Sequence, residues 1–271
     1  MDQLILASEC DVVNEVICAP ADVKELFEFT EPLLTLGTFP ITKTILLMFL
    51  AAFIVIALLY FGLRKRSLIP GKFEIVIESS VEFVRDGVGR DVIGPEGVKY
   101  VPYLLSLFLF ILVSNLFEIT PFINFPVTSR MAIPAFLAIV TYAIFVIVGF
   151  RKNGFQYLTA TVWPTHVPIG LRWLVGLIEL VSIFILRPFT LAVRLFANMV
   201  AGHLMLTLLL GSAFIFLTSW GEVGFKALVG VPWLALGLFI FVFEIVVAVL
   251  QAYIFTLLSA VYIESSIHFE H

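Results

Sequence analysis

The chain has 271 residues, of which 61% are hydrophobic and only 13% are charged. Soluble domains are about half apolar and about a quarter charged, so this composition excludes an ordinary soluble protein and indicates a polytopic membrane protein. The formal net charge is -4, and the sequence has no basic patch of the kind that attracts nucleic acid, so no nucleic-acid partner is expected.

The first 40 residues form a polar tail that precedes the first apolar run. The tail contains the only two cysteines, Cys10 and Cys18. Two free thiols are one interpretation, and a disulfide is the alternative if the tail faces an oxidising compartment. Residues 41–271 are expected to form a single membrane helical domain.

Three apolar runs in the first half of the chain reach the length of about 20 residues that a membrane-spanning helix needs: 41–63, 100–117 and 131–150. An amphipathic segment lies between the first two. It predicts a helix in the membrane interface, and a soluble loop helix is the equally supported alternative. Its apolar face comprises Phe73, Val76, Ile77, Val81, Val84 and Val88, and its glutamates are Glu74, Glu78 and Glu82.

Residues 171–217 form a nearly continuous apolar run. As one helix it would be about 70 Å long, more than twice the hydrocarbon thickness of a bilayer. Pro188 would kink a helix rather than reverse it, and residues 190–200 offer no turn chemistry. A single long, steeply tilted helix is therefore favoured over a hairpin. Residues 231–263 are similarly overlong and should lie alongside it, after a polar turn at residues 219–222.

The predicted fold is thus an all-α integral membrane protein with about five membrane-embedded helices, the last two long and steeply tilted, plus one interfacial amphipathic helix. Basic clusters at residues 64–66 and 151–152 follow the first and third spans. Both clusters lie on the cytoplasmic side if the N-terminus is outside. The C-terminus is then cytoplasmic.

Arg194 is a charged residue within the long apolar run, with no acid within four residues on either side. A charged side chain near the bilayer centre costs at least ~2.5–3.5 kcal/mol, and arginine does not escape by losing its proton. A chain that tolerates this cost is usually using the charge. The alternative is an arginine that snorkels from a helix end to the interface.

Polar residues form matched stripes on the last two helices. Glu244, Gln251 and Tyr262 lie within about 20° of one helical face. On the other helix, Thr190, Arg194 and Asn198 recur at i+4 spacing. For each residue alone, a hydrogen bond between helices is an alternative explanation.

Counting inward from the turn at 219–222 places His203 level with Glu244, and Arg194 level with Gln251. An acid and an imidazole in low dielectric can exchange protons. Arginine cannot, so it suits a fixed barrier. Glu179 and Ser182, one turn apart, could line a second, inward-facing conduit. Two such half-channels require a moving carrier between them.

The run Arg-Leu-Phe-Ala-Asn-Met-Val-Ala-Gly-His at 194–203, followed by Leu-Gln-Ala-Tyr-Ile-Phe at 250–255, resembles subunit a of the F-type ATP synthase. The resemblance covers nearly the whole chain. It includes Ser-Asn-Leu-Phe-Glu at 114–118 with Pro121, and Glu-Leu-Val-Ser at 179–182 before Arg187-Pro188. Ala197 stands where many members have glycine.

The resemblance implies a role for each polar residue. Arg194 is implied to be the stator arginine that faces the carboxylates of the rotating c ring. His203 and Glu244 resemble the outer half-channel pair, in an acid–histidine order reciprocal to that of some members. The remaining assignments are Asn115, Asn198 and Gln251 beside the outer half-channel, and Glu179, Ser182 and Tyr262 along the inner one.

The expected function is therefore a proton-translocating stator subunit that is not itself an enzyme. The chain has no phosphate-binding Gly-x-x-x-x-Gly-Lys loop, so ATP chemistry is assigned to partner subunits. Expected partners are the c ring, the peripheral-stalk b subunits and, through the stalks, the catalytic head. No cofactor or metal is expected. The expected location is the bacterial plasma membrane, with an organellar inner membrane as alternative.

A self-contained proton-coupled secondary transporter is the alternative function. It predicts an internal repeat, which the sequence lacks. The choice between protons and sodium ions depends on the carboxylate site of the ring, which is outside this chain.

Overall fold

The structure is a computed structural model that describes residues 16–18, 34–36, 39–64, 71–120, 123, 125, 127–157, 162–163 and 168–268. The elements are β1 (Leu34–Leu36), β2 (Phe39–Ile41), α2 (Lys43–Arg64), α3 (Lys72–Glu82), η1 (Phe83–Ile93), η2 (Pro95–Tyr100), α4 (Val101–Ile119), η3 (Val127–Ser129), α5 (Ala132–Asn153), η4 (Ile169–Leu171), α7 (Arg172–Val181), η5 (Ser182–Leu186), α8 (Arg187–Thr218), α9 (Trp220–Val223), η6 (Gly224–Val229) and α10 (Gly230–Ile267).

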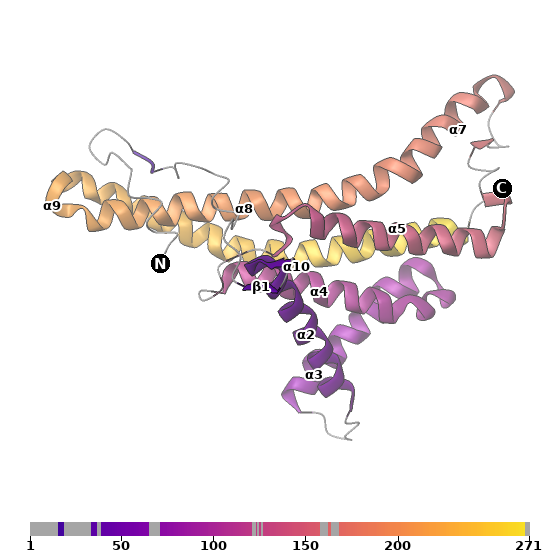
Figure 1. The fold of residues 1–271 in the computed structure, drawn as a ribbon, viewed down its shortest axis with the longest axis horizontal. Coiled ribbons are helices and arrows are strands. Elements are labelled where there is room, and N and C mark those ends of the chain that lie inside the picture. The colour runs from indigo at the N-terminus through magenta and orange to yellow at the C-terminus, as the bar shows by residue number, and fades with distance from the viewer. Residues whose placement is uncertain are drawn as a thin grey trace. The chain divides into compact units, whose positions relative to one another are not determined.

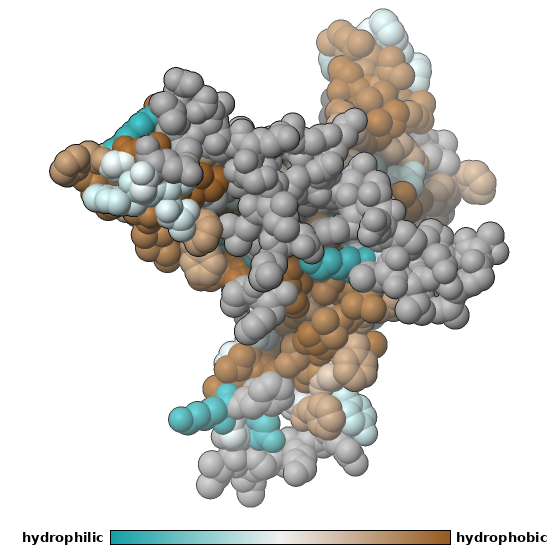
Figure 2. All heavy atoms as spheres, turned by 60° about the vertical axis from the view of Figure 1, so that its left-hand side comes forward, coloured by the Kyte–Doolittle hydropathy of each residue, from teal (hydrophilic) through white to brown (hydrophobic). Residues whose placement is uncertain are grey.

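Among the described residues, five helical stretches are long and apolar enough to cross a membrane. They are Lys43–Gly62, Pro95–Ile119, Ala132–Asn153, Arg172–Thr218 and Gly224–Ile267. The predicted all-α membrane fold is confirmed. The short antiparallel pairing of β1 with β2, ahead of α2, was not predicted. Figure 2 shows hydrophobic residues over much of the described surface in view, as expected for helices that face lipid or other membrane subunits.

The run from Arg172 to Thr218 is one continuous helical stretch of 47 residues, so the hairpin alternative is wrong. Figure 1 shows α7 running on into α8 without a reversal. The helix widens to a π-helix over η5, which ends two residues before Pro188. Proline has no N–H to bond the carbonyl four residues back, and a wide turn accommodates that gap. The inclination of this helix to the membrane stays a prediction.

The chain divides into two compact units, to which α2, α4, α8 and α10 each contribute a part. Unit 1 comprises Met1–Leu50, Ser114–Ser129 and Ala197–Val249. Unit 2 comprises Ala51–Val113, Arg130–Phe196 and Leu250–His271. The prediction of a single membrane domain from residue 41 onwards stays a prediction.

In unit 1, α8 and α10 run antiparallel in close contact. A methyl group on Gly237 would overlap the side chain of Leu210, and one on Gly230 would overlap that of Leu217. Glycine lets the two helices approach at these positions. A residue later in α8 therefore faces a residue earlier in α10, as in the pairs Leu210–Gly237 and Leu217–Gly230.

The described part of the N-terminal tail, residues 16–18, lies on these two helices. The backbone N–H of Cys18 donates to Ser212 Oγ at 2.9 Å, and Trp233 Nε1 donates to the carbonyl of Val16 at 3.0 Å. Cys18 is buried against Phe216. Cys18 is disulfide-bonded, so the free-thiol interpretation is wrong for it. Cys10 lies outside the described residues, as do most of the tail and residues 269–271.

In unit 2, a buried apolar core joins α4, α5 and the end of α10 and includes Leu104, Phe145 and Phe255. The amphipathic segment is helical, as α3 followed by η1. Val84 and Val88 are fully buried, whereas Val76 is 65% exposed, so the buried face is narrower than predicted. The side chain of Phe73 lies outside the described residues.

A charged group stabilises the exposed side of η1. Arg85 donates to both carboxylate oxygens of Asp86, at 3.1 and 2.7 Å, and Arg90 donates to Oδ1 at 3.0 Å. These hydrogen bonds and charges lower the pKa of the Asp86 carboxyl.

Candidate functional site

Four polar side chains from three helices are buried in unit 1. Asn115 and Glu118 lie near the end of α4, His203 lies on α8, and Glu244 lies on α10. Each is 5% exposed or less. Buried ionisable groups are costly unless they interact with one another, so these four side chains, named the outer cluster after their predicted role, form a candidate site.

Glu118 provides the link between α4 and the histidine. Its Oε1 lies 3.8 Å from Nδ1 of His203, and both side chains are 2% exposed. That distance is beyond direct hydrogen bonding. The carboxyl group of Glu244 lies against Gly202, the residue that precedes His203. Two acids and an imidazole therefore share one buried site.

Glu244 is placed against the backbone of α8. A Cβ atom on Gly202 would overlap the carboxyl group of Glu244, so only glycine leaves room for it there. Gly202 directly precedes His203, so the carboxyl group of Glu244 packs against α8 one residue before the histidine. Among the described residues, Oε2 of Glu244 has no hydrogen-bond partner.

Asn115 connects the cluster to α10 and to the segment after α4. Thr128 Oγ1 donates to its Oδ1 at 3.0 Å, and its Nδ2 donates to the carbonyl of Ala248 at 3.5 Å. Ala248 is one helical turn beyond Glu244, and Glu118 is one turn beyond Asn115. The asparagine thus fixes α4 against α10 at the level of the two acids.

Sequence reasoning missed Glu118 and Thr128 as site residues. Glu118 was recognised only as part of a motif, although its spacing of three from Asn115 puts both on one helical face. That spacing was the available signal. Thr128 carried none, because it lies 13 residues from Asn115 and shares no helical spacing with it.

Arg194 lies on the exposed face of α8. Its side chain is exposed, and so are Ala197 and Ala201, which follow on the same face. Within the described part of the chain, the guanidinium makes no hydrogen bond or ion pair. Thr190, one turn before, bonds only to backbone carbonyls of its own helix.

The two amide residues predicted beside the outer path, Asn198 and Gln251, belong to different units. Asn198 in unit 1 is half-buried, and Gln251 in unit 2 is 5% exposed. Neither Asn198 Nδ2 nor Gln251 Nε2 has a hydrogen-bond partner among the described residues. Each therefore keeps an amide donor available.

The residues predicted along the inner path all lie in unit 2, half-buried. Arg187 lies with its guanidinium 5.1 Å from the centroid of the Tyr262 ring and donates to Ser265 Oγ at 2.9 Å. The start of α8 is thus held on the end of α10. No hydrogen bond or ion pair joins Glu179 or Ser182 to Tyr262 within the described segments.

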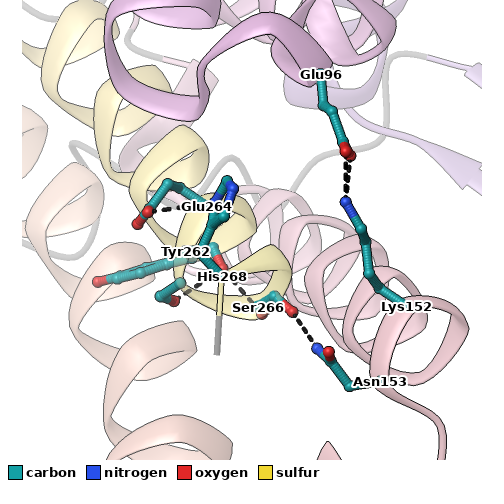
Figure 3. A network of polar contacts seen from close by, with 8 residues as sticks. Glu96, Lys152, Asn153, Tyr262, Glu264, Ser266 and His268 are labelled. Carbon is teal, nitrogen blue, oxygen red and sulfur yellow. Dashed lines mark hydrogen bonds and ion pairs between the residues drawn. The ribbon is translucent and has the colours of Figure 1, made fainter. Parts of the chain in front are cut away.

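Polar groups also gather around the end of α10 (Figure 3). Asn153 Nδ2 donates to the carbonyl of Ser266 at 2.9 Å, and His268 Nδ1 lies 3.6 Å from Glu264 Oε1. Polar side chains therefore surround the end of α10.

Comparison with known proteins agrees with the resemblance seen in the sequence. The family model described as ATP synthase A chain matches residues 45–264. ATP synthase subunit a of Rhodococcus erythropolis strain PR4 is 37% identical over 234 residues, which cover 86% of this chain and 84% of the relative. ATP synthase subunit a of Frankia alni is 40% identical over 235 residues, covering 85% and 79%. That of Rhodospirillum rubrum is 38% identical over 227 residues, covering 84% and 89%. The chain belongs to the ATP synthase A chain family.

Proposed function

We propose that this multi-pass membrane protein is the stator subunit through which protons drive the rotor of an ATP synthase. The observation that carries the proposal is Arg194: an exposed, unreleasable positive charge on an apolar helix, without a hydrogen bond or ion pair to any described residue. A charge in that position suits a carboxylate supplied by a partner subunit.

The geometry of α8 separates the arginine from the buried cluster. Arg194 and His203 are nine residues apart, which is about 180° around the helix and about 13 Å along it. The exposures of the two side chains support this separation, since Arg194 is exposed and His203 is 1% exposed. One face of α8 meets a partner, and the opposite face serves a buried path.

The outer half-channel runs past Glu244, His203, Glu118 and Asn115, with Asn198 and Gln251 toward the arginine. Buried acid and imidazole groups in electrostatic contact can pass a proton between them. The inner half-channel runs past Glu179, Ser182 and Tyr262. Arg194 holds a ring carboxylate ionised between the two paths and prevents direct leakage.

The c ring carries that carboxylate, the b subunits hold the chain against rotation, and the catalytic head performs the ATP chemistry. The N-terminus lies outside and the C-terminus in the cytoplasm of a bacterial plasma membrane. One proton moving down 100 mV releases about 2.3 kcal/mol, so several protons are needed for each ATP.

Replacing Arg194 tests the proposal. Arg194→Ala removes the charge, and Arg194→Lys substitutes a compact, strongly hydrated ammonium that can deprotonate. Neither should support coupled ATP synthesis, and Arg194→Ala should also leak protons through membranes stripped of the catalytic head. Thr190→Ala on the same face should behave as wild type. Normal ATP synthesis without extra leak in Arg194→Ala would refute the mechanism.

A further inference from the structure

Arg187 holds the aromatic ring of Tyr262 within unit 2. Arg187 is the first residue of α8, and its side chain is half-buried. The guanidinium carbon lies 5.1 Å from the centroid of the Tyr262 ring, and Nη1 donates to Ser265 Oγ at 2.9 Å. Ser265 Oγ in turn donates to the backbone carbonyl of Tyr262 at 3.0 Å. One guanidinium is therefore joined both to the ring of Tyr262 and, through Ser265, to its backbone.

A second aromatic contact fixes the same ring. Phe145 of α5 is 1% exposed, and its ring centroid lies 5.9 Å from that of Tyr262 at an interplanar angle of 61°. Edge-to-face pairs of this kind are favourable, and a buried partner cannot easily move. The Tyr262 ring is thus held by a cation and by a buried ring.

The hydroxyl group of Tyr262 is left free while its ring is fixed. Within the described part of the chain, the phenol oxygen makes no hydrogen bond. Figure 3 shows the Tyr262 side chain pointing away from Lys152 and Asn153. A phenol hydroxyl can both donate and accept a hydrogen bond, so a fixed ring presents one such group at a constant position.

We propose that Arg187 is a positioning residue of the inner half-channel, which holds the Tyr262 ring so that its hydroxyl stays in the proton path. The inference rests on the proposed function, which assigns Tyr262 to that half-channel. The hydroxyl accepts a proton on one side as it donates its own on the other, so the phenol is unchanged after each transfer. Transfer requires hydrogen-bond reach, and a ring that swings away interrupts it. Arginine suits this role, because its planar guanidinium can stack on a ring and donate hydrogen bonds at the same time.

The test varies the pH on each side of the membrane separately. The intact ATP synthase is reconstituted with catalytic heads outward, so that the inner half-channel opens to the medium. ATP-driven acidification of the lumen is followed at different medium pH values, with the initial lumen pH fixed and the membrane potential clamped by potassium and valinomycin. Arg187→Met keeps the apolar stem and removes both contacts. Because the fraction of time that the ring is in place scales the apparent proton affinity, the medium pH of half-maximal pumping should fall by about 0.5–1 pH unit.

Two controls separate this effect from a general structural loss. The dependence of pumping on lumen pH should be unchanged in Arg187→Met, whereas a merely structural defect would lower the rate without distinguishing the two sides. Arg151→Met removes an exposed arginine from the end of α5 in the same unit and should behave as wild type. All variants carry the same catalytic head, so the pH dependence of ATP hydrolysis is common to them.

Tyr262→Phe shows whether Arg187 acts through the hydroxyl group. This variant keeps the ring and its contact with Arg187, and it should shift the medium-pH dependence at least as far as Arg187→Met does. In the Tyr262→Phe background, Arg187→Met should add no further shift. If Arg187→Met fails to accumulate, Arg187→Lys is measured instead, because an ammonium lacks the planar fork that makes both contacts.

Each outcome decides the matter. An unchanged medium-pH dependence in Arg187→Met overturns the inference, and so does an equal shift in Arg151→Met or a further shift on top of Tyr262→Phe. If Tyr262→Phe shifts the dependence and Arg187→Met does not, the inner half-channel stands and the role of Arg187 is rejected. If Tyr262→Phe pumps as wild type at every medium pH, the place of Tyr262 in the proposed function fails, and the role of Arg187 fails with it.

Discussion

A methyl group on Gly202 tests the placement of Glu244 more finely than removing the acid. The Cβ of Gly202→Ala would lie 2.6 Å from both Cδ and Oε2 of Glu244. Carbon atoms in good contact are about 3.5–4.0 Å apart, so the carboxyl group must retreat by about 1 Å. Overpacking of this kind costs about 1–3 kcal/mol, which an assembled complex can tolerate.

The functional cost should exceed the structural one. A displacement of about 1 Å at a reacting group can cost about a hundredfold in rate. We therefore expect Gly202→Ala to assemble and to make ATP at about one-tenth to one-hundredth of the wild-type rate. The assay is ATP synthesis after an acid–base jump in reconstituted vesicles, normalised to the amount of complex.

Gly211→Ala is the matched control. Gly211 lies on the same helix and in the same unit, and no heavy atom is within 4 Å of its hypothetical Cβ. It should synthesise ATP normally. Shortening the acid provides a second check, because Gly202→Ala should cost less in a Glu244→Asp background if the clash is the cause. Wild-type synthesis by Gly202→Ala alone would refute the reasoning.

Two further predictions concern stability. Cys18→Ser should lower the melting temperature of the purified complex, since disulfides typically contribute about 2–4 kcal/mol, and a reductant should lower it in wild type but not further in the variant; no shift with reductant would contradict this. Gly176→Ala should reduce the amount of complex in membranes, because its Cβ would overlap the carbonyl of Val162, whereas Gly170→Ala has open space; equal amounts of the two variants would contradict it.

The helices could be predicted from the sequence because bilayer thickness sets a minimum apolar length for every span. Residues 171–217 were predicted as one helix, and the structure has it at Arg172–Thr218. The widened turn at η5 escaped prediction, since apolar counting is insensitive to which backbone carbonyl an N–H reaches. The only signal for the widened turn in the sequence was Pro188, which lacks a backbone N–H.

Part of the candidate site could be predicted by counting residues along the helices. Residue numbers alone put His203 and Glu244 at one level, and in the structure Glu244 lies against the residue next to His203. The close approach itself depends on Gly202, whose role is invisible until the partner helix is placed. Glu118 enters the cluster through its approach to His203, a contact between segments far apart in the chain that no local pattern encodes.

The docking of the N-terminal segment has a consequence for biogenesis. Cys18 bonds to Ser212, 194 residues later, and Val16 bonds to Trp233, 217 residues later. At about 5–20 residues per second, a ribosome needs roughly 10–40 s to supply that surface. Residues 16–18 are made first and cannot attach until α8 and α10 have been made and have paired. Their attachment then reports that insertion is complete.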